Sequence, residues 1–354
     1  MSDYLPKDQM TKNSQSVVAR KRGSDFVEVN LADGVRLWIL QDPRFKTVAI
    51  RAFLHRPLDD RATETALLPA VLRRGCRRQV TLAKIAAYLE NLYGASYGAD
   101  VQKTGEIHLL AFSMDVVSDR FVPRGGKILP EAVRFLARVM TEPVRQGKGL
   151  RRDYVEGEKE NLKRLIEALV NDRGAYAHER CIREMCRGEA FERYEYGRVE
   201  DLPRVTPESL AAFHRETLET APVEFFVAGD VGAASLERAF RAAFPFKRRR
   251  VAAAPPSVLK PAAAAPREIV EAMDVEQGHL VIGARTGLTW ADDQIFALSF
   301  ANGILGGFAH SKLFRNVRER EGLAYAAGSS IDPAKACSSS ARGSMRPSTT
   351  APGP

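Results

Sequence analysis

The sequence predicts an α+β fold of two homologous units, the second of which is cut short. The 354 residues are enough for two domains of about 150 residues each. Residues 64–103 run in the order helix, glycine, helix, glycine, strand, and residues 292–330 repeat this order, with Tyr97 and Tyr325 in the matching strands. A repeated order of elements favours a duplicated unit. No strand signal follows residue 330, so the last strand of the second unit lacks a predicted pairing partner.

Changes of composition divide the chain into five predicted segments. Residues 247–266 are rich in Ala, Pro, Lys and Arg without a helical stripe, which is typical of a linker. Ser, Thr, Pro and Gly dominate the last residues, and a truncation or a change of reading frame near Lys335 would explain them; a natural disordered tail is the alternative. The segments are a flexible leader (1–24), an N-terminal domain (25–246), the linker (247–266), a partial C-terminal domain (267–335) and a disordered or aberrant tail (336–354).

Periodicity places the elements within these segments. Apolar and polar residues alternate over 26–40 around Asp33-Gly34, which is a hairpin signal. Thr206 followed by Pro207 is a typical helix start. The remaining predicted strands are 47–55, 96–103, 106–112, 223–228, 268–273, 279–284 and 323–330, and the predicted helices are 64–72, 82–92, 128–141, 154–186, 206–218, 235–243, 292–305 and 311–321.

Composition argues against several classes of protein. The apolar runs are far shorter than the ~20 residues of a transmembrane helix, and the N-terminus lacks the apolar region of a signal peptide. We therefore expect a soluble, cytoplasmic protein without membrane contact. The four cysteines are too few for a disulfide framework, so reduced thiols are expected. The net charge of +9 includes basic clusters at 73–78 and 247–250, but no nucleic-acid motif accompanies them, and solvated basic faces are expected.

The most informative segment is residues 306–325. Its sequence is Gly-Gly-Phe-Ala-His-Ser-Lys-Leu-Phe-Arg-Asn-Val-Arg-Glu-Arg-Glu-Gly-Leu-Ala-Tyr. They resemble the C-terminal-domain signature of the insulinase/pitrilysin metallopeptidases, the inverted zincins, in which a small-residue turn precedes Ser-x-Leu-Phe-x-x-Val-Arg-Glu and Gly-Leu-Ala-Tyr. The resemblance spans about residues 25–335, loosely in the middle and tightly at 64–112 and 300–330. It implies a fold of two homologous domains like those of mitochondrial processing peptidase (LuxS/MPP-like), with mixed sheets packed by helices around a peptide-holding chamber.

The resemblance also implies a substrate-binding pair. The signature arginine falls on Arg318 and the tyrosine seven residues later on Tyr325. A guanidinium offers a rigid fork of donors to peptide carbonyls, and a phenol can donate a hydrogen bond to a carbonyl oxygen as it gains negative charge. In the alternative interpretation, Arg318 is a solvated helix residue and Tyr325 an aromatic at the edge of the core.

The zinc motif of the family is degenerate in this chain. Active members carry His-x-x-Glu-His on a helix before a small turn, which here is Arg73-Arg74-Gly75-Cys76. Counting back from that turn places Ala66, Pro69 and Ala70 at the motif positions, and the third ligand falls on Leu165, although Glu167 is close. The side chains of Ala66, Pro69, Ala70 and Leu165 can neither bind zinc nor move a proton. His178-Glu179 begins like a zincin motif but has no closing histidine, and His214 is expected on a helix surface.

The resemblance therefore points to the bacterial non-catalytic branch of the family, of the type associated with 5-aminopentanol modification of elongation factor P. Residues 66–72 and 92–95 also resemble that branch. Such members are often paired with a zinc-bearing paralogue, so the implied function is a subunit of a heterodimer that binds a peptide while its partner holds the zinc; no cofactor is expected in this chain. Two alternatives stay open: a self-sufficient zinc endopeptidase, and a purely structural partner whose Arg318/Tyr325 pair is a relic.

Overall fold

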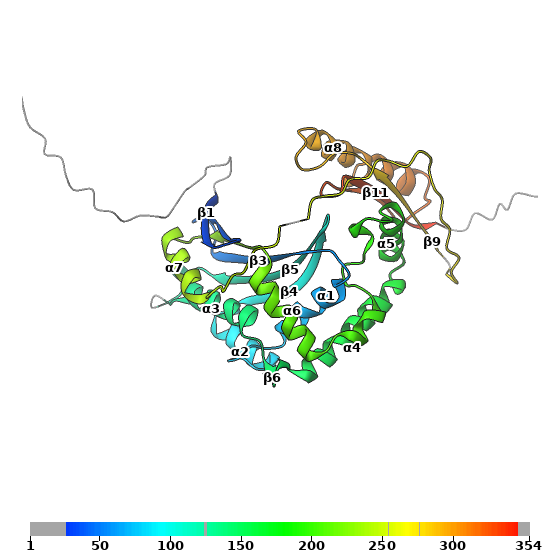
Figure 1. Cartoon of the computed structure of the whole chain (residues 1–354). Coiled ribbons are helices and arrows are strands. Elements are labelled where there is room, and N and C mark those ends of the chain that lie inside the picture. The colour runs from blue at the N-terminus through cyan, green and yellow to red at the C-terminus, as the bar shows by residue number, and fades with distance from the viewer. Residues whose placement is uncertain (1–25, 124–125, 254, 276, 346–354) are drawn as a thin grey trace, which may run out of the picture.

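The computed structural model describes residues 26–123, 126–253, 255–275 and 277–345 (Figure 1). Its main sheet has six strands in the order β1-β2-β8-β3-β5-β4. All neighbours are antiparallel except β2 and β8, which run parallel. The strands are β1 (Phe26–Ala32), β2 (Val35–Gln41), β3 (Thr47–Pro57), β4 (Ser96–Thr104), β5 (Ile107–Val117) and β8 (Val223–Gly229). The predicted hairpin is present, and its turn holds Gly34 at φ 63°.

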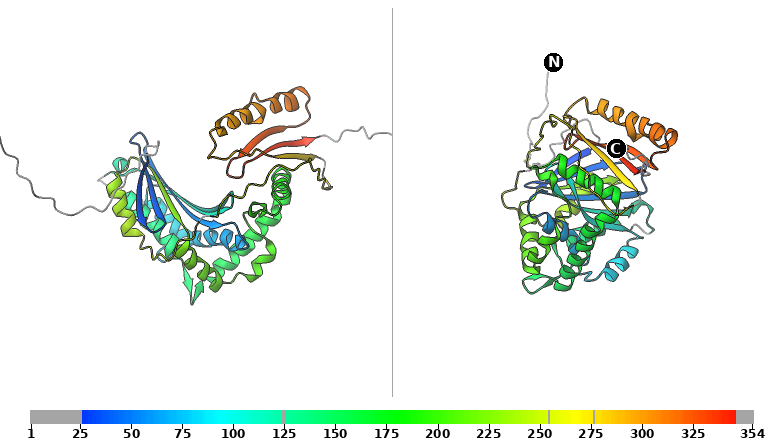
Figure 2. Two further views of the ribbon diagram at one scale, coloured as in Figure 1. Left: turned by 45° about the horizontal axis from the view of Figure 1, so that its top comes forward. Right: turned by 90° about the vertical axis from the view of Figure 1, so that its right-hand side faces the viewer.

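Alternation along the strands separates a buried sheet face from a partly exposed one. In β3, Ile50 and Leu54 are buried, whereas the residue that follows each of them, Arg51 and His55, is half-exposed. Helices pack on the buried face, as the two views of Figure 2 show. They are α1 (Ala62–Arg73), α2 (Leu82–Asn91), α3 (Ile128–Thr141), α6 (Pro207–Thr220) and α7 (Ala233–Ala243). The core thus lies between one face of the sheet and this helical layer.

Local sequence signals explain where these helices begin. Thr206 caps α6 through its side chain, Ser209 completes a capping box, and Pro207 stands in the first turn, as predicted. Thr81 likewise accepts a hydrogen bond from the backbone N–H of Lys84 at the start of α2. A short hairpin of β6 (Arg145–Gln146) and β7 (Gly149–Leu150) links α3 to the next helix.

The single helix predicted over 154–186 is wrong. The structure has α4 (Arg152–Ala168), a 3-10 turn η2 (Leu169–Asn171) and α5 (Arg173–Met185). The side chain of Asp172 accepts a hydrogen bond from the backbone N–H of Ala175, so a new N-cap starts α5. The other 3-10 turns are η1 (Asp119–Phe121), η3 (Ala190–Glu192) and η4 (Val199–Arg204).

The C-terminal part contains a three-stranded antiparallel sheet in the order β10-β11-β9. Its elements are β9 (Gly278–Arg285), α8 (Ile295–Asn302), the π-helical turns η5 (Gly303–Gly307) and η6 (Phe314–Arg320), β10 (Ala326–Asp332) and β11 (Cys337–Met345). The strand predicted over 268–273 is absent, because those residues are irregular. Conversely, β11 lies where a disordered tail was expected, and it supplies the pairing partner that β10 lacked in the prediction.

The two sheets share a topology. In the N-terminal sheet, β3 is followed by α1 and α2 and then by the hairpin β4–β5, and β5 lies between β3 and β4. In the C-terminal sheet, β9 is followed by α8 and η6 and then by β10–β11, and β11 lies between β9 and β10. The repeated order that the sequence suggested therefore extends to strand neighbours and to their antiparallel directions.

Buried charges join the C-terminal sheet to the N-terminal part. Lys335 is fully buried, and its ammonium contacts the carboxylates of Glu106, in the β4–β5 turn, and of Glu189, at 2.6 Å from the Glu189 Oε2. Arg285 of β9 forms a second ion pair with Glu189. Two cations from the C-terminal part thus meet two carboxylates of the N-terminal part, and we call these four residues the buried ion cluster.

Candidate functional site

The predicted zinc-motif positions lie on α1, within the core. Ala66 and Pro69 are buried and Ala70 is half-buried. Pro69 stands inside the helix, where it has no N–H to donate to the carbonyl of Thr65. At the position of the expected general base, the chain therefore has a residue that weakens the helix and offers neither a metal ligand nor a proton acceptor. The side chains at these positions do not fit a zinc ion.

Helix α4, which carries the predicted third-ligand position, packs against α1. The Nη1 of Arg74, just past the end of α1, lies 2.8 Å from the Oε1 of the buried Glu158 on α4. Leu165 lies further along α4 with 43% of its surface exposed. The neighbouring Glu167 is exposed and lies 4.0 Å from Lys163, so it forms only a surface ion pair. The helix pair is thus present, while its side chains offer an alkyl group in place of a ligand.

The other candidate ligands have structural partners. His178 hydrogen-bonds Ser339 of β11 at 3.2 Å, and Glu179 lies 3.5 Å from the ammonium of Lys103. Burial raises the pKa of Glu179, which the nearby Lys103 opposes. Within the described residues, no three His, Cys, Asp or Glu side chains are grouped so that they could hold a metal ion.

The expectation that His214 lies on a helix surface is wrong. His214 faces the core from α6, and its Nε2 lies 2.7 Å from the carbonyl oxygen of Met140 on α3, which requires Nε2 to carry the proton. Burial lowers the pKa of His214 to about 4. His108 on β5 is also fully buried, and burial lowers its pKa to about 4 as well. Both histidines are core residues of the N-terminal part.

The predicted substrate-binding pair lies in the C-terminal part. Arg318 is on η6, exposed, with its guanidinium carbon 4.5 Å from the ring centroid of Phe314. Tyr325 comes directly before β10 and is 79% exposed, so it does not lie at the edge of the core, whereas the exposed Arg318 also agrees with the alternative interpretation. Among the described residues, neither side chain makes a hydrogen bond or an ion pair to another protein group. Both are therefore accessible to a ligand.

Comparison with known proteins identifies the family. Residues 204–343 match the family model described as the peptidase M16 inactive domain. The chain is 33% identical over 303 residues to the "Probable inactive metalloprotease YmfF" of Bacillus subtilis. The alignment covers 85% of this chain and 71% of that protein. The chain belongs to the peptidase M16, or insulinase, family. The resemblance seen in residues 306–325 is thus confirmed.

Solved structures agree with this assignment. A conserved protein from Enterococcus faecalis V583 is 33% identical and superposes with a TM-score of 0.81 over 91% of this chain and 76% of that one. The peptidase M16 inactive domain from Pseudomonas fluorescens shares the fold, with a TM-score of 0.74 at 19% identity over 90% of this chain and 74% of that one. The M16 chain is therefore α+β, as predicted, and the family model and the Bacillus relative both describe inactive members. In the described part, no helix is both long and apolar enough to span a membrane.

The sequence did not reveal the buried ion cluster. Glu106, Glu189, Arg285 and Lys335 are far apart along the chain, and each is a common surface residue type with no motif around it. Only the docking of the C-terminal sheet beside the β4–β5 turn brings them together. The one signal available was Lys335 itself, which stands at the point where the composition changes.

Proposed function

We propose that this M16 chain is a non-catalytic subunit that contributes Arg318 and Tyr325 to a composite zinc metallopeptidase, whose zinc and water base come from a paralogous partner. The observation that carries the proposal is the contrast between the two halves. The motif positions on α1 and α4 hold alkyl and prolyl side chains, whereas the Arg and Tyr of the C-terminal signature are intact and exposed.

The chemistry assigned to the pair follows from its donors. The guanidinium of Arg318 would hold backbone carbonyls of an extended peptide. The phenol of Tyr325 would donate a hydrogen bond to the carbonyl oxygen at which negative charge develops during hydrolysis. Neither group has a competing protein partner among the described residues, so no existing hydrogen bond must break before a peptide binds.

An exposed apolar stripe supports the need for a partner. On α8, Phe296 and Phe300 are one helical turn apart and are 75% and 71% exposed, and Ile304 continues the stripe into η5. Exposed apolar patches of this kind mark protein interaction sites. In this proposal the first homologous domain is residues 25–246, and the second begins at residue 267 and includes β11, beyond the predicted boundary at 335; the repeated strand order supports this division.

The test is reconstitution with a zinc-bearing M16 paralogue from the same genome and a quenched fluorescent peptide library as substrate. Tyr325→Phe should lower kcat by about 100-fold to 1,000-fold, as loss of a hydrogen-bond donor to the developing oxyanion does. Arg318→Ala should mainly raise KM. The matched control is Arg315→Ala, an exposed arginine in the same π-helical turn, η6, which should leave turnover unchanged.

Two outcomes would contradict the proposal. Unchanged turnover in both Arg318→Ala and Tyr325→Phe would favour the structural-partner alternative, in which the pair is a relic. One tightly held zinc in the isolated chain, together with peptidase activity that chelator removes and zinc restores, would favour the self-sufficient enzyme. Zinc content is measured by mass spectrometry on the purified chain. Loss of that zinc in Glu179→Gln or Glu167→Gln would likewise favour the self-sufficient enzyme.

A further inference from the structure

Two basic segments adjoin at the end of the N-terminal part that lies away from the C-terminal sheet. Residues 73–78, which begin at the last residue of α1, and residues 145–152, around the β6–β7 hairpin, contain no Asp or Glu. In Figure 1, β6 lies at the bottom of the molecule and α8 at the top. We call the basic side chains of these segments the basic patch: Arg73, Arg74, Arg77, Arg78, Arg145, Lys148, Arg151 and Arg152.

Backbone pairing and one tyrosine hold the two segments together. Cys76 forms an isolated β-bridge with Pro143, and the N–H of Arg77 donates to the carbonyl of Glu142 at 2.8 Å. The buried Tyr154 donates its hydroxyl hydrogen to the carbonyl of Val80. Its ring carries the guanidinium of Arg151 at 4.5 Å and that of Arg74 at 5.2 Å from the centroid. The patch is therefore part of a fixed surface.

Most of the charge in the basic patch has no carboxylate partner. Arg74 pairs with Glu158 and Arg151 with Asp153. The other six cations have no carboxylate within ion-pair distance among the described residues, and Arg73, Arg77, Arg78, Arg145, Lys148 and Arg152 are all exposed. Six like charges on adjoining segments repel one another, and the flanking Glu142 and Asp153 lie outside ion-pair distance of all six.

The start of α4 increases this positive potential. Its N-cap is Arg151, which makes no capping hydrogen bond through its side chain, and Arg152 is the first helical residue. The N-terminus of a helix carries partial positive charge and favours acidic or small polar residues. Two arginines there oppose helix stability, and Asp153 offsets only part of this. Helix formation therefore does not explain these residues.

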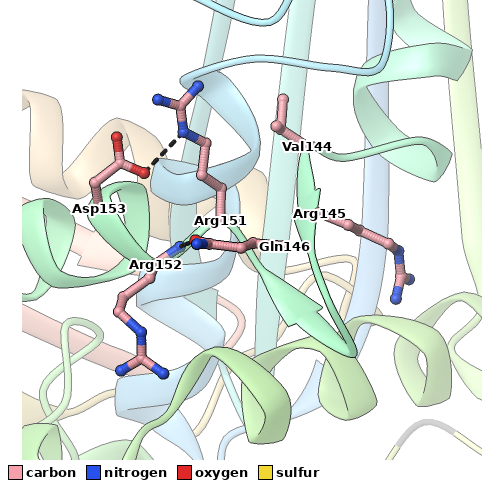
Figure 3. Close-up of a pocket in the computed structure, with 6 residues that line it drawn as sticks. All are labelled: Val144, Arg145, Gln146, Arg151, Arg152 and Asp153. Atoms are coloured by element: carbon pink, nitrogen blue, oxygen red, sulfur yellow. Dashed lines mark hydrogen bonds and ion pairs between the residues drawn. The ribbon is translucent and has the colours of Figure 1, made fainter.

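The shape of the patch indicates an extended ligand. A shallow hollow of about 640 Å³ is lined by Val144, Arg145, Gln146, Arg151, Arg152 and Asp153. The side chains of Arg145, Arg151 and Arg152 point in three different directions around it (Figure 3). These three guanidinium groups diverge, so they do not form a common site for one small anion. Anions distributed along a chain could contact several.

We infer that the basic patch is a docking surface for an acidic, carboxylate-rich segment of another protein. Seven of its eight cations are arginines, and the planar guanidinium matches a carboxylate with two parallel hydrogen bonds. Nucleic acid fits less well, because the two segments carry no exposed aromatic side chain on which a base could stack, and Tyr154 is covered by guanidinium groups on its ring. The β6–β7 hairpin lies at the far end of the molecule from α8 and β11 (Figure 1), so this surface is independent of the function proposed for Arg318 and Tyr325.

Fluorescence anisotropy of a labelled decaglutamate peptide on the full chain at 150 mM NaCl tests this inference. Arg77→Glu, Arg145→Glu and Arg152→Glu together should weaken binding by about 10-fold to 100-fold, since three exposed attractive pairs become repulsive. The matched control combines Lys247→Glu, Arg250→Glu and Lys312→Glu, which change the net charge equally at exposed cations outside the patch. The control should bind the peptide nearly as well as the wild type.

Three results would overturn the inference. Absence of peptide binding by the wild-type chain would reject the docking surface. An equal loss in the control variant would show that net charge alone is responsible. Tighter binding of a 20-nucleotide single-stranded oligonucleotide than of the peptide, lost in the patch variant, would assign the surface to nucleic acid instead. Both triple variants should fold, because all substituted side chains are exposed. Circular dichroism checks this.

Discussion

Replacing Lys335 by methionine is expected to loosen the attachment of the C-terminal sheet. The ammonium of Lys335 contacts Glu106, which is only 4% exposed and has no other ion-pair partner among the described residues. Methionine keeps most of the side-chain volume but leaves this carboxylate buried and unpaired. Glu189 is affected less, because Arg285 still pairs with it.

The size of the effect of Lys335→Met follows from the number of ion-pair partners that each carboxylate keeps. Removing one member of a buried ion pair costs about 3–5 kcal/mol, since the remaining charge stays away from water. At about 1.4 kcal/mol per factor of ten, the population with the C-terminal sheet detached should rise by about two to four orders of magnitude. Hydrogen–deuterium exchange of the amides in β9, β10 and β11 measures this directly, whereas exchange in β3 and β5 should change little.

Two further variants decide whether the reasoning holds. Lys312→Met removes an exposed lysine of the C-terminal part that has no carboxylate partner in the described residues, and exchange should stay at the wild-type rate. Glu106→Gln added to Lys335→Met should restore part of the protection, because the unpaired charge is gone. If Lys335→Met exchanged no faster than Lys312→Met, the buried ion cluster would not hold the sheet in place.

Three other measurements test the core of the N-terminal part. The folded-state pKa of His214, about 4, lies below the unfolded value of 6.5. The contribution of this difference to the free energy of unfolding is therefore complete above pH 6.5 and is lost as the pH falls towards 4. It amounts to about 3 kcal/mol, and chemical denaturation of His214→Gln should show a correspondingly flatter pH dependence than the wild type. Gly197→Ala should lower the melting temperature strongly, because φ is 74° and a Cβ would lie 2.6 Å from the Cα of Thr63. Gly94→Ala, with φ 72° and no atom within 4 Å of the Cβ, should show only the backbone strain of about 1 kcal/mol; equal shifts in the two variants would refute the steric argument. Finally, changing Pro69 to alanine should stabilise the isolated chain, because the helix gains an N–H donor, and a lower melting temperature would contradict this.

Local signals predicted much of the N-terminal part. The apolar stripe of residues 128–141 gave both ends of α3, and Thr206-Pro207 gave the start of α6, because these patterns act within one or two turns of helix. The break between α4 and α5 was missed although Asp172 is a good N-cap, because helical periodicity continues on both sides of it. A side-chain cap can therefore start a new helix within a stretch of continuous helical periodicity.

Other features depend on tertiary contacts that no local pattern encodes. The sequence of α6 does not show that His214 points towards the carbonyl of Met140, since that depends on how α3 and α6 pack. Strand β11 is rich in serine and has no apolar alternation; its backbone pairs with β9 and β10 on both sides. For the site, the signature around Arg318 identified the family, whereas the contact between residues 73–78 and 142–152 became visible only through the bridge from Cys76 to Pro143.

The buried ion cluster also sets an order of events during synthesis. Glu106, whose one ion-pair partner among the described residues is Lys335, leaves the ribosome 229 residues before that lysine. At about 5–20 residues per second, this carboxylate waits for about 11–46 seconds before its partner is made, whereas Arg285 reaches Glu189 earlier. During that interval Glu106 has no partner cation, so it is expected to stay hydrated. Final consolidation of this region is therefore a late step that follows the growth of the chain.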